Sequence, residues 1–382
     1  MQIGVLKETV EGERRVALVP ESVQRLVKAG HSILVQAGAG EASGNLNAEY
    51  EKAGGALAAE ADEIVPRCDI LVKVRAPDRE GARRLKEGAL LIALMEAARN
   101  EALLQELASA GVTVLALEQV PRIARAQNMD VLSSMSTVSG YKAVLLAAVR
   151  LPRFFPLLMT AAGTIPPARV LIIGAGVAGL QAIATARRLG ARVEAFDPRP
   201  AAREQVESLG GRFVGAELLD AAVETAGGYA REQTGEEQAR QREALKGAVA
   251  GANVVICSAL VAGRKAPVVL DEAMVRSMKA GSVIIDLAAE QGGNCELTQA
   301  GQEVVCHGVM IHGPENVPSL LPRDASRMFS RNVANLLRLL IKDGSFIDFQ
   351  ADEVARACLA VHQGKVWSGG QPAMATGSGA SS

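Results

Sequence analysis

A glycine-rich turn in the middle of the chain has the residue types and the spacing that hold a dinucleotide. Four apolar residues, 170–173, lead into the motif GAGVAG, which supplies Gly174, Gly176 and Gly179, and a helical pattern follows from about Val177. In such a strand–turn–helix unit the first glycine permits a tight turn, the second lets the backbone approach a pyrophosphate, and the third lets the helix pack closely on the strand. The pyrophosphate then meets the free N–H groups at the start of the helix.

An acidic residue follows this motif at the end of the next predicted strand. The carboxylate of Asp197 is placed to accept hydrogen bonds from both ribose hydroxyls of a bound nucleotide. It would repel the 2′-phosphate of NADP, so the motif favours NAD. NADP remains an alternative, because the guanidinium of Arg199 can neutralise its 2′-phosphate.

The chain offers no obvious partner for proton transfer. A dehydrogenase that acts on an alcohol or an amine needs a general acid or base near the nicotinamide. His31 follows a helix-ending glycine, His307 and His312 flank a short strand, and His362 lies near the C-terminus. None belongs to a Ser-His-Asp order, a metal-ligand spacing or an HExxH helix, and the five cysteines form no CxxC pair. We therefore expect a cofactor site with no metal.

Two further polar clusters follow predicted strands, where α/β sheets collect groups that contact ligands. Residues 121–134 contain Arg122 and Asp130, which we expect to form a buried ion pair that holds a nicotinamide by its carboxamide. The alternative is a polar loop that only caps the following helix. Residues 286–294 combine two carboxylates with glycines, and we expect them to border the same cleft.

Elements that would position these residues alternate regularly between short apolar runs and helical patterns, which predicts an α/β fold. The 382 residues exceed what one hydrophobic core usually holds. We expect two domains, each with a parallel sheet, and a cleft between them. The predicted strands are Ile3–Leu6, Ile33–Val35, Ile70–Val74, Leu90–Leu94, Val112–Leu117, Val170–Ile173, Val193–Phe196, Val254–Ile256 and Val283–Asp286.

The connections between these elements include two long helices and one long insertion. Residues 139–155 are predicted to form an apolar helix, interrupted at Pro152, that joins the domains. Residues 325–342 are predicted to form a second helix, which is stopped at Gly344. Residues 221–248 contain a Gly-Gly-Tyr sequence and dense charge but no apolar run, so they are either a functional lid or a disordered segment.

Composition excludes several classes of partner. The formal net charge is −1, with 41 basic and 42 acidic residues scattered along the chain, so neither nucleic acid nor an anionic membrane is indicated as a direct partner. No secretory signal is visible, and no uninterrupted apolar run approaches the about 18 residues of a membrane span. We expect no direct membrane insertion, and the unpaired cysteines suggest a reducing compartment.

Long motifs in this sequence resemble the soluble NAD(H)-binding component, alpha subunit 1, of proton-translocating nicotinamide nucleotide transhydrogenase. The likeness runs over nearly the whole chain. The segments that carry it are Val5–Glu8, Glu13–Ala17, Pro121–Ile123, Asp130–Met135, Thr160–Ala168, the GAGVAG turn, Ala226–Ala230, Lys265–Pro267, Ile285–Ala288 and Gly292–Cys295.

The resemblance implies an α/β fold of two Rossmann-like domains with parallel sheets and an NAD-binding cleft between them, and it implies where the site residues lie. The first Rossmann-like domain would cover residues 1–135, completed by 325–368, and the NAD-binding domain 140–318, with a flexible tail at 369–382. Four residues would lie beside the dihydronicotinamide: Arg122, Gln127, Asp130 and Ser133. The nucleotide-binding turn and ribose contacts would be Gly174, Gly176, Val177, Gly179, Asp197, Pro198 and Arg199, with Gly228 and Tyr229 on a mobile loop and Leu260 on the adenosine side.

The resemblance also implies a reaction and an assembly. Hydride would pass directly between NAD(H) on this chain and NADP(H) on a partner subunit, coupled to proton translocation through membrane-embedded subunits. The chain would be a homodimer, cytoplasmic and peripheral on the cytoplasmic face of the inner membrane. Direct hydride transfer releases no proton at that step, which agrees with the missing acid–base residue.

Two other functions stay open at this point. The alanine dehydrogenase family is similar in fold and shares Arg15, but its catalytic histidine falls at Met95 or Glu96, and it lacks the Gly-Gly-Tyr insertion. Its substrate-binding lysine and its catalytic aspartate correspond to Lys73 or Arg75 and to Glu290. The third reading is a non-catalytic module that senses NAD.

Overall fold

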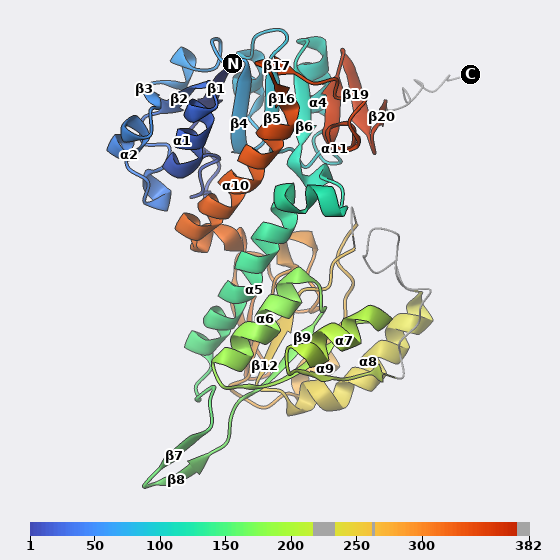
Figure 1. Ribbon diagram of the computed structural model, residues 1–382. Coiled ribbons are helices and arrows are strands. Elements are labelled where there is room, and N and C mark those ends of the chain that lie inside the picture. Colours follow the sequence, from blue (N-terminus) through green and yellow to red (C-terminus); the bar gives the residue numbers. More distant parts are fainter. Residues whose placement is uncertain (217–233, 262–263, 373–382) are drawn as a thin grey trace, which may run out of the picture. The chain divides into compact units, whose positions relative to one another are not determined.

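The chain folds as two compact α/β units, each built around its own sheet (Figure 1). The structure is a computed structural model that describes residues 1–216, 234–261 and 264–372. One unit comprises residues 1–135 with 319–382, and the other comprises residues 136–318.

The first unit contains a nine-stranded sheet. Its strands are β1 Gln2–Val5, β2 Ser32–Gln36, β3 Ala56–Ala58, β4 Ile70–Arg75, β5 Leu90–Leu94, β6 Thr113–Ala116, β18 Leu359–His362, β19 Lys365–Ser368 and β20 Gln371–Pro372. They lie in the order β20-β19-β18-β6-β5-β4-β1-β2-β3. Strands β1 to β6 pair in parallel, whereas the C-terminal strands add an antiparallel extension at β6.

Helices cover this sheet and tie the C-terminal segment to the N-terminal one. They are α1 Pro20–Lys28, α2 Asn47–Lys52, α3 Arg79–Arg83, α4 Glu101–Ser109, α10 Pro322–Leu340 and α11 Glu353–Cys358, and a small hairpin, β16 Ile341–Lys342 and β17 Ser345–Phe346, follows α10. The hydroxyls of Ser326 and Ser330 on α10 accept hydrogen bonds from the backbone N–H groups of Val16 and Val19. Residues far apart in the chain therefore share one core.

The second unit contains a seven-stranded sheet and a separate hairpin. The sheet strands are β9 Arg169–Ile173, β10 Arg192–Phe196, β11 Arg212–Phe213, β12 Val254–Cys257, β13 Val283–Asp286, β14 Glu303–Cys306 and β15 Val309–His312, in the order β11-β10-β9-β12-β13-β15-β14. Of these described strands, only β14 is antiparallel to its neighbour. The other elements are α5 Val131–Arg150, which begins in the first unit and continues into the second after Met135, α6 Val177–Arg188, α7 Pro200–Ser208, α8 Gly235–Gly251, α9 Glu272–Ser277, and the hairpin β7 Leu158–Thr160 with β8 Gly163–Ile165.

The predicted α/β fold with two parallel-rich sheets is confirmed. Strands β5 and β13 begin and end at the residues expected from their apolar runs, and α6 begins at Val177 as predicted. Strands β3, β14 and β18 to β20 were not expected. They lie at or near the sheet edges, where short or solvent-facing strands carry a weaker apolar pattern.

Four expectations about the connections need correction. The joining helix is α5 Val131–Arg150, so it begins eight residues before the expected start at 139 and ends before Pro152. Helix α10 ends at Leu340, because the chain turns into the β16–β17 hairpin. Residues 235–248 of the expected lid belong to helix α8. Gln371–Pro372 of the expected tail pair with β19.

One helix among the described residues, α5, is long and apolar enough to meet the length and hydropathy criteria for a membrane span. An uninterrupted apolar run does not reveal it, because serines and Lys142 interrupt the pattern. Core helices of soluble proteins meet the same criteria, so length and hydropathy alone do not identify α5 as a membrane span. Gly140 on α5 lies against α6, since an added Cβ there would stand 2.0 Å from the carbonyl oxygen of Ala178.

Candidate functional site

The glycine-rich turn joins β9 to α6 with the geometry that its sequence predicted. Gly174 has φ +91°, a conformation that favours glycine, and its N–H donates to the carbonyl of Phe196 at 2.9 Å. An added Cβ at Gly179 would stand 1.8 Å from the carbonyl oxygen of Gly174. Gly174 and Gly179 are therefore required by the fold of the turn itself.

Gly176 differs from its two neighbours, because nothing in the described protein requires a glycine there. An added Cβ would meet no atom within 4 Å, and φ is −75°. Gly176 is the N-cap of α6 and supplies no side chain to accept from the first N–H groups of the helix. Open space in front of unsatisfied donors fits a pyrophosphate, whose negative charge the helix N-terminus favours.

A pair of alanine variants separates these roles. We expect Gly176→Ala to leave the free energy of unfolding within about 1 kcal/mol of the wild type and to weaken NADH binding at least about tenfold. We expect Gly179→Ala to destabilise the fold by about 3 kcal/mol, because its Cβ collides with backbone. Denaturant unfolding and calorimetric titration with NADH measure both quantities. Tight NADH binding by Gly176→Ala would contradict the assignment.

Asp197 lies directly after β10 and is almost fully buried, with 4% of its surface exposed. One carboxylate oxygen accepts from the backbone N–H and Nε of Arg199, at 2.9 and 2.8 Å. The other accepts from the N–H of Ala175 in the glycine-rich turn and from Nη2 of Arg199, at 2.8 and 2.9 Å. Asp197 thus fastens the turn to the end of β10.

The sequence predicted that the Asp197 carboxylate accepts hydrogen bonds from the ribose hydroxyls, but in the structure the carboxylate already has other donors. Each oxygen already accepts two hydrogen bonds, so a ribose must share them or displace the Arg199 side chain. While Arg199 pairs with Asp197, its guanidinium is also partly neutralised, which weakens its expected role toward a 2′-phosphate.

The cluster at residues 286–294 supports a neighbouring loop. Asp286 is fully buried and accepts from the N–H groups of Ala288, Asn294 and Cys295 and from the hydroxyl of Thr298. Buried Asn294 accepts from the N–H of Ala259 at 3.0 Å and donates to the carbonyls of Ala259 and Pro267, both at 2.8 Å.

This network holds the segment beside the glycine-rich turn. The hydroxyl of Ser258 donates to the carbonyl of Gly174 at 3.0 Å, and Leu260, the predicted adenosine-side residue, follows two positions later and is partly exposed. The expectation that this cluster borders the cofactor cleft stays a prediction. The burial of Asp286 and its four donors give that carboxylate a supporting role, and the side chain of Asn294 connects the cluster to the loop at Ala259.

The first unit holds the four residues predicted to lie beside the nicotinamide. They occupy the loop that contains the 3₁₀ helices η3 Leu117–Gln119 and η4 Ala124–Met129, and the first turn of α5. Asp130 accepts from the N–H of Ser133 at 2.9 Å and from its hydroxyl at 2.5 Å, so it caps α5. The alternative interpretation, a polar loop that caps the helix, is therefore correct about the capping. The expected burial of an Arg122–Asp130 ion pair is wrong for the chain by itself, because Arg122 is exposed and Asp130 is only partly buried, and the pair itself stays a prediction.

Contacts with the C-terminal helices hold this loop in place. The carbonyl of Asn128 accepts from the side-chain amides of Asn332 and Asn335 on α10, both at 2.9 Å. Arg125 forms an ion pair with Asp352 at the start of α11. The side chains of Arg122 and Gln127 are exposed on the loop so fixed. Gly228 and Tyr229 lie outside the described residues.

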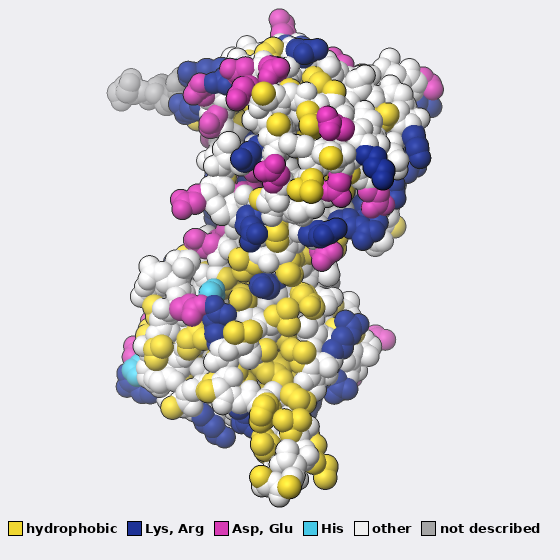
Figure 2. All heavy atoms as spheres, turned by 90° about the vertical axis from the view of Figure 1, so that its left-hand side faces the viewer, with side chains coloured by type: hydrophobic (Ala, Val, Ile, Leu, Met, Phe, Trp, Pro, Cys, Tyr) yellow, Lys and Arg dark blue, Asp and Glu magenta, His cyan; other side chains and the backbone are white. Residues whose placement is uncertain are grey.

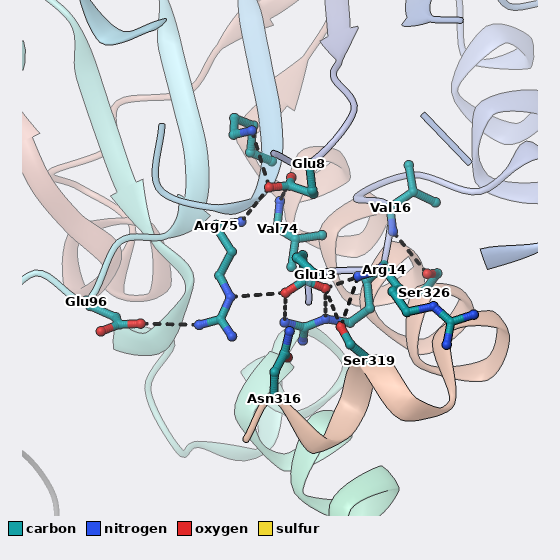
Figure 3. Close-up of polar contacts among 12 residues, drawn as sticks. Glu8, Glu13, Arg14, Val16, Val74, Arg75, Glu96, Asn316, Ser319 and Ser326 are labelled. Carbon is teal, nitrogen blue, oxygen red and sulfur yellow. Dashed lines mark hydrogen bonds and ion pairs between the residues drawn. The ribbon is translucent and has the colours of Figure 1, made fainter. Parts of the chain in front are cut away.

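A buried ion network, shown in Figure 3, lies in the first unit after β1 and at the end of β4. Glu13 accepts two hydrogen bonds from the Arg15 guanidinium, at 2.7 and 2.6 Å, and one from the Arg15 backbone N–H at 3.0 Å. It also accepts from the Ser319 hydroxyl at 2.6 Å and pairs with Arg75 at 3.1 Å. Arg75 also pairs with Glu96 at 3.2 Å. Sequence reasoning gave Glu13 no role, because its partners lie up to 306 positions away.

A second carboxylate, Glu8, extends the network. It pairs with Lys73 at 3.3 Å and accepts from the N–H of Val74 at 2.6 Å. Burial raises the pKa of Glu8 despite the charge of Lys73. Each of the three basic groups, Arg15, Lys73 and Arg75, therefore faces a carboxylate of the chain itself.

The pKa of Glu13 predicts how acid acts on the fold. Burial alone would raise this pKa, but the hydrogen bonds and charge of Arg15, with the Ser319 hydroxyl, lower it from 4.5 to about 2. A lowered pKa contributes stability that is present above pH 4.5 and is lost as the pH falls toward 2. We expect this group to remove about 3 kcal/mol of unfolding free energy over that window.

Substitution of Glu13 isolates that contribution. We expect Glu13→Gln to lose about 3–5 kcal/mol at neutral pH, because Arg15 keeps a buried charge, and to show a shallower loss between pH 4.5 and 2. Urea unfolding across this pH range measures both effects. Glu21→Gln is the control, since Glu21 also pairs with arginines but on the surface. An acid slope of wild-type size in Glu13→Gln would refute the assignment.

Two of the histidines in the second unit form hydrogen bonds with surface glutamates. His307 bonds to Glu272 at 2.8 Å, and His312 bonds to Glu303 at 2.7 Å. Among the described residues, no group of three or more histidine, cysteine or acidic side chains is arranged to hold a metal ion.

Family models match both halves of the chain. The N-terminal domain model of alanine dehydrogenase/PNT matches residues 4–139, and the C-terminal domain model matches residues 143–369. The chain belongs to this family. The predicted membership is therefore confirmed.

Members of the alanine dehydrogenase/PNT family that resemble the chain include transhydrogenases and alanine dehydrogenases. The first part of the NAD(P) transhydrogenase alpha subunit of Rhodospirillum rubrum is 47% identical over 344 residues, covering 88% of this chain and 89% of the relative. The crystal structure of transhydrogenase from Sinorhizobium meliloti matches with a TM-score of 0.84 and 39% identity, over 96% of this chain and 99% of that one. Alanine dehydrogenase of Halomonas elongata is 31% identical, over 96% and 94%.

Proposed function

We propose that the chain is the NAD(H)-binding subunit of a Re/Si-specific, proton-translocating NAD(P) transhydrogenase. It would exchange hydride directly between its own NAD(H) and NADP(H) on a partner subunit. The observation that carries the nucleotide part is the turn at Gly176, where open space faces uncapped N–H groups of α6 beside the Asp197 bonds. Greater identity to transhydrogenase subunits than to alanine dehydrogenases supports the reaction.

The proposal assigns a role to each predicted site residue. Arg122, Gln127, Asp130 and Ser133 would orient the dihydronicotinamide, and Gly174, Gly176, Val177, Gly179, Asp197, Pro198 and Arg199 would bind the pyrophosphate and ribose. Gly228 and Tyr229 would cover the nucleotide and Leu260 would contact its adenosine. Bound NAD(H) supplies the hydride chemistry, while the chain's residues bind and orient it.

The proposed assembly includes a homodimer, the NADP(H)-binding subunit and membrane-embedded subunits. The chain would lie in the cytoplasm, peripheral on the cytoplasmic face of the inner membrane, and couple hydride transfer to proton translocation. The name of the Rhodospirillum rubrum relative, one portion of subunit alpha, supports membership of a larger enzyme.

Reconstitution tests this proposal. The purified chain, mixed with a separate NADP(H)-binding subunit, should transfer hydride from NADPH to an NAD analogue that is followed by its absorbance. The chain alone should show none. Absence of transfer at saturating nucleotide would overturn the proposal, and NADH binding without transfer in any mixture would favour a sensing module.

Alanine dehydrogenation is the second candidate, and the ion network argues against it. Position 95 is a fully buried methionine, and Glu96 is ion-paired with Arg75. The place of that family's catalytic histidine thus holds no imidazole. We expect no NAD-dependent oxidation of alanine by the isolated chain, and turnover in that assay would restore this candidate.

A further inference from the structure

Helix α10 carries an asparagine on its buried face, where an apolar residue would be the ordinary choice. Charged side chains of both signs lie on the surface of the first unit, the upper body in Figure 2, whereas the buried side of α10 is mostly apolar. Its apolar residues include Phe329, Val333, Leu336 and Leu337. Asn332 lies among them with 7% of its surface exposed. A buried amide costs free energy unless its groups are bonded, so packing alone does not account for Asn332.

The amide of Asn332 is bonded on one side only. Its Nδ2 donates to the carbonyl oxygen of Asn128 at 2.9 Å. Its Oδ1 is buried and has no hydrogen-bond partner among the described residues. A small apolar side chain at this position would leave no buried acceptor without a donor, so the fold itself gains little from the amide. Within the part of the chain that the structure describes, the amide therefore serves the loop that contains Asn128.

A second asparagine, about one turn further along α10, donates to the same oxygen. Nδ2 of Asn335 lies 2.9 Å from the carbonyl oxygen of Asn128. Residues three positions apart lie on one face of a helix, so the two amides reach this oxygen together. A carbonyl oxygen has two lone pairs, and both are engaged here. The backbone next to Gln127 is thereby fixed to a helix that lies more than 200 positions away in the chain.

The loop has another attachment to the C-terminal segment, but a weaker one. Arg125 pairs with one oxygen of Asp352, whose other oxygen caps the start of α11. Arg125 is half exposed, and exposed ion pairs contribute little to stability. The two amides on α10 are therefore the firmer support of the loop, on which Gln127 itself is exposed.

We propose that Asn332 and Asn335 are positioning residues for hydride transfer. They hold the backbone at Asn128, and through it they place the side chain of Gln127. The inference rests on the proposed function, in which Gln127 orients the dihydronicotinamide. Misplacement of a reacting ring by a fraction of an ångström penalises the rate steeply, whereas binding energy is spread over many contacts. The two amides should therefore control the rate of transfer and not the affinity for NADH.

The double variant Asn332→Ala/Asn335→Ala tests this role. By stopped-flow mixing of the full chain with the NADP(H)-binding subunit, we expect it to transfer hydride about 30-fold more slowly and to change the NADH dissociation constant by no more than about threefold. We expect its melting temperature to stay within about 3 °C of the wild type, because the substitution also removes the unpartnered acceptor. Arg331→Ala is the matched control, since Arg331 precedes Asn332 on α10 but bonds to Glu21, and it should keep the wild-type rate.

A mutant cycle with Gln127→Ala separates positioning from a merely structural role. If the asparagines act through Gln127, their removal should slow the Gln127→Ala protein by no more than about threefold, because the side chain that they place is already absent. Full multiplication of the two losses would overturn the inference. So would a wild-type transfer rate in the double variant.

Amide hydrogen exchange of the isolated chain measures the loop without any transfer. We expect the amides of residues 124–130 to exchange at least about tenfold faster in the double variant and at the wild-type rate in Arg331→Ala. Unchanged exchange in the double variant would also overturn the inference. A wild type that transfers no hydride would refute the proposed function, whereas faster exchange in the double variant would still establish that the two asparagines hold the loop.

Discussion

Asp197→Asn is expected to weaken NADH binding by about 1–3 kcal/mol, roughly tenfold to a hundredfold in the dissociation constant. The carboxylate holds the glycine-rich turn through Ala175 and accepts three bonds from Arg199. An asparagine keeps one acceptor oxygen but loses the charge. The single amide oxygen must then accept from both the ribose hydroxyls and the N–H of Ala175 in the turn, and as a neutral acceptor it forms weaker hydrogen bonds. Isothermal titration of NADH into each protein measures the change.

Glu194→Gln is the matched control for this effect. Glu194 is also nearly buried on β10, and it pairs with Arg169 and Arg212 at 3.3 and 2.7 Å. It makes none of the bonds to the glycine-rich turn, so we expect its loss to lower stability and to leave NADH affinity unchanged. Equal losses of affinity in both variants would reduce Asp197 to a structural role.

Arg122→Ala is expected to slow hydride transfer about a hundredfold while changing the NADH dissociation constant by no more than about threefold. Arg122 projects from a loop whose backbone is held by Asn332 and Asn335, and whose end is capped by Asp130. A side chain on such a support can orient a ring without supplying much binding energy. Misplacement of the reacting carbon penalises the rate far more than the affinity.

Arg125→Ala controls for the general effect of removing a loop arginine. Arg125 lies three residues further along the same loop and pairs with Asp352 instead. We expect its loss to leave the transfer rate within about threefold of the wild type. Rates come from stopped-flow mixing with the NADP(H)-binding subunit. Parallel losses of rate and affinity in Arg122→Ala would indicate a simple binding residue.

The glycine-rich turn was predictable because its requirements are local. Gly174 needs a positive φ, and Gly179 must approach Gly174 closely. Both requirements arise within six consecutive residues, so the spacing of the glycines alone predicts the turn. The strands were predictable for a similar reason, since buried parallel strands are continuous apolar runs. The start of α5 was missed because its first turn is polar and is set by the capping carboxylate of Asp130.

The sequence by itself determined the α/β fold, the family and the place of the nucleotide-binding turn, since each depends on neighbouring residues and their period. Only the tertiary structure decided that Asp197 is engaged by Arg199, that Glu13 neutralises Arg15 and Arg75, and that Asn294 supports the loop before Leu260. The physical reason is that charge pairing and burial depend on which distant segments the fold brings together, and no local pattern records that.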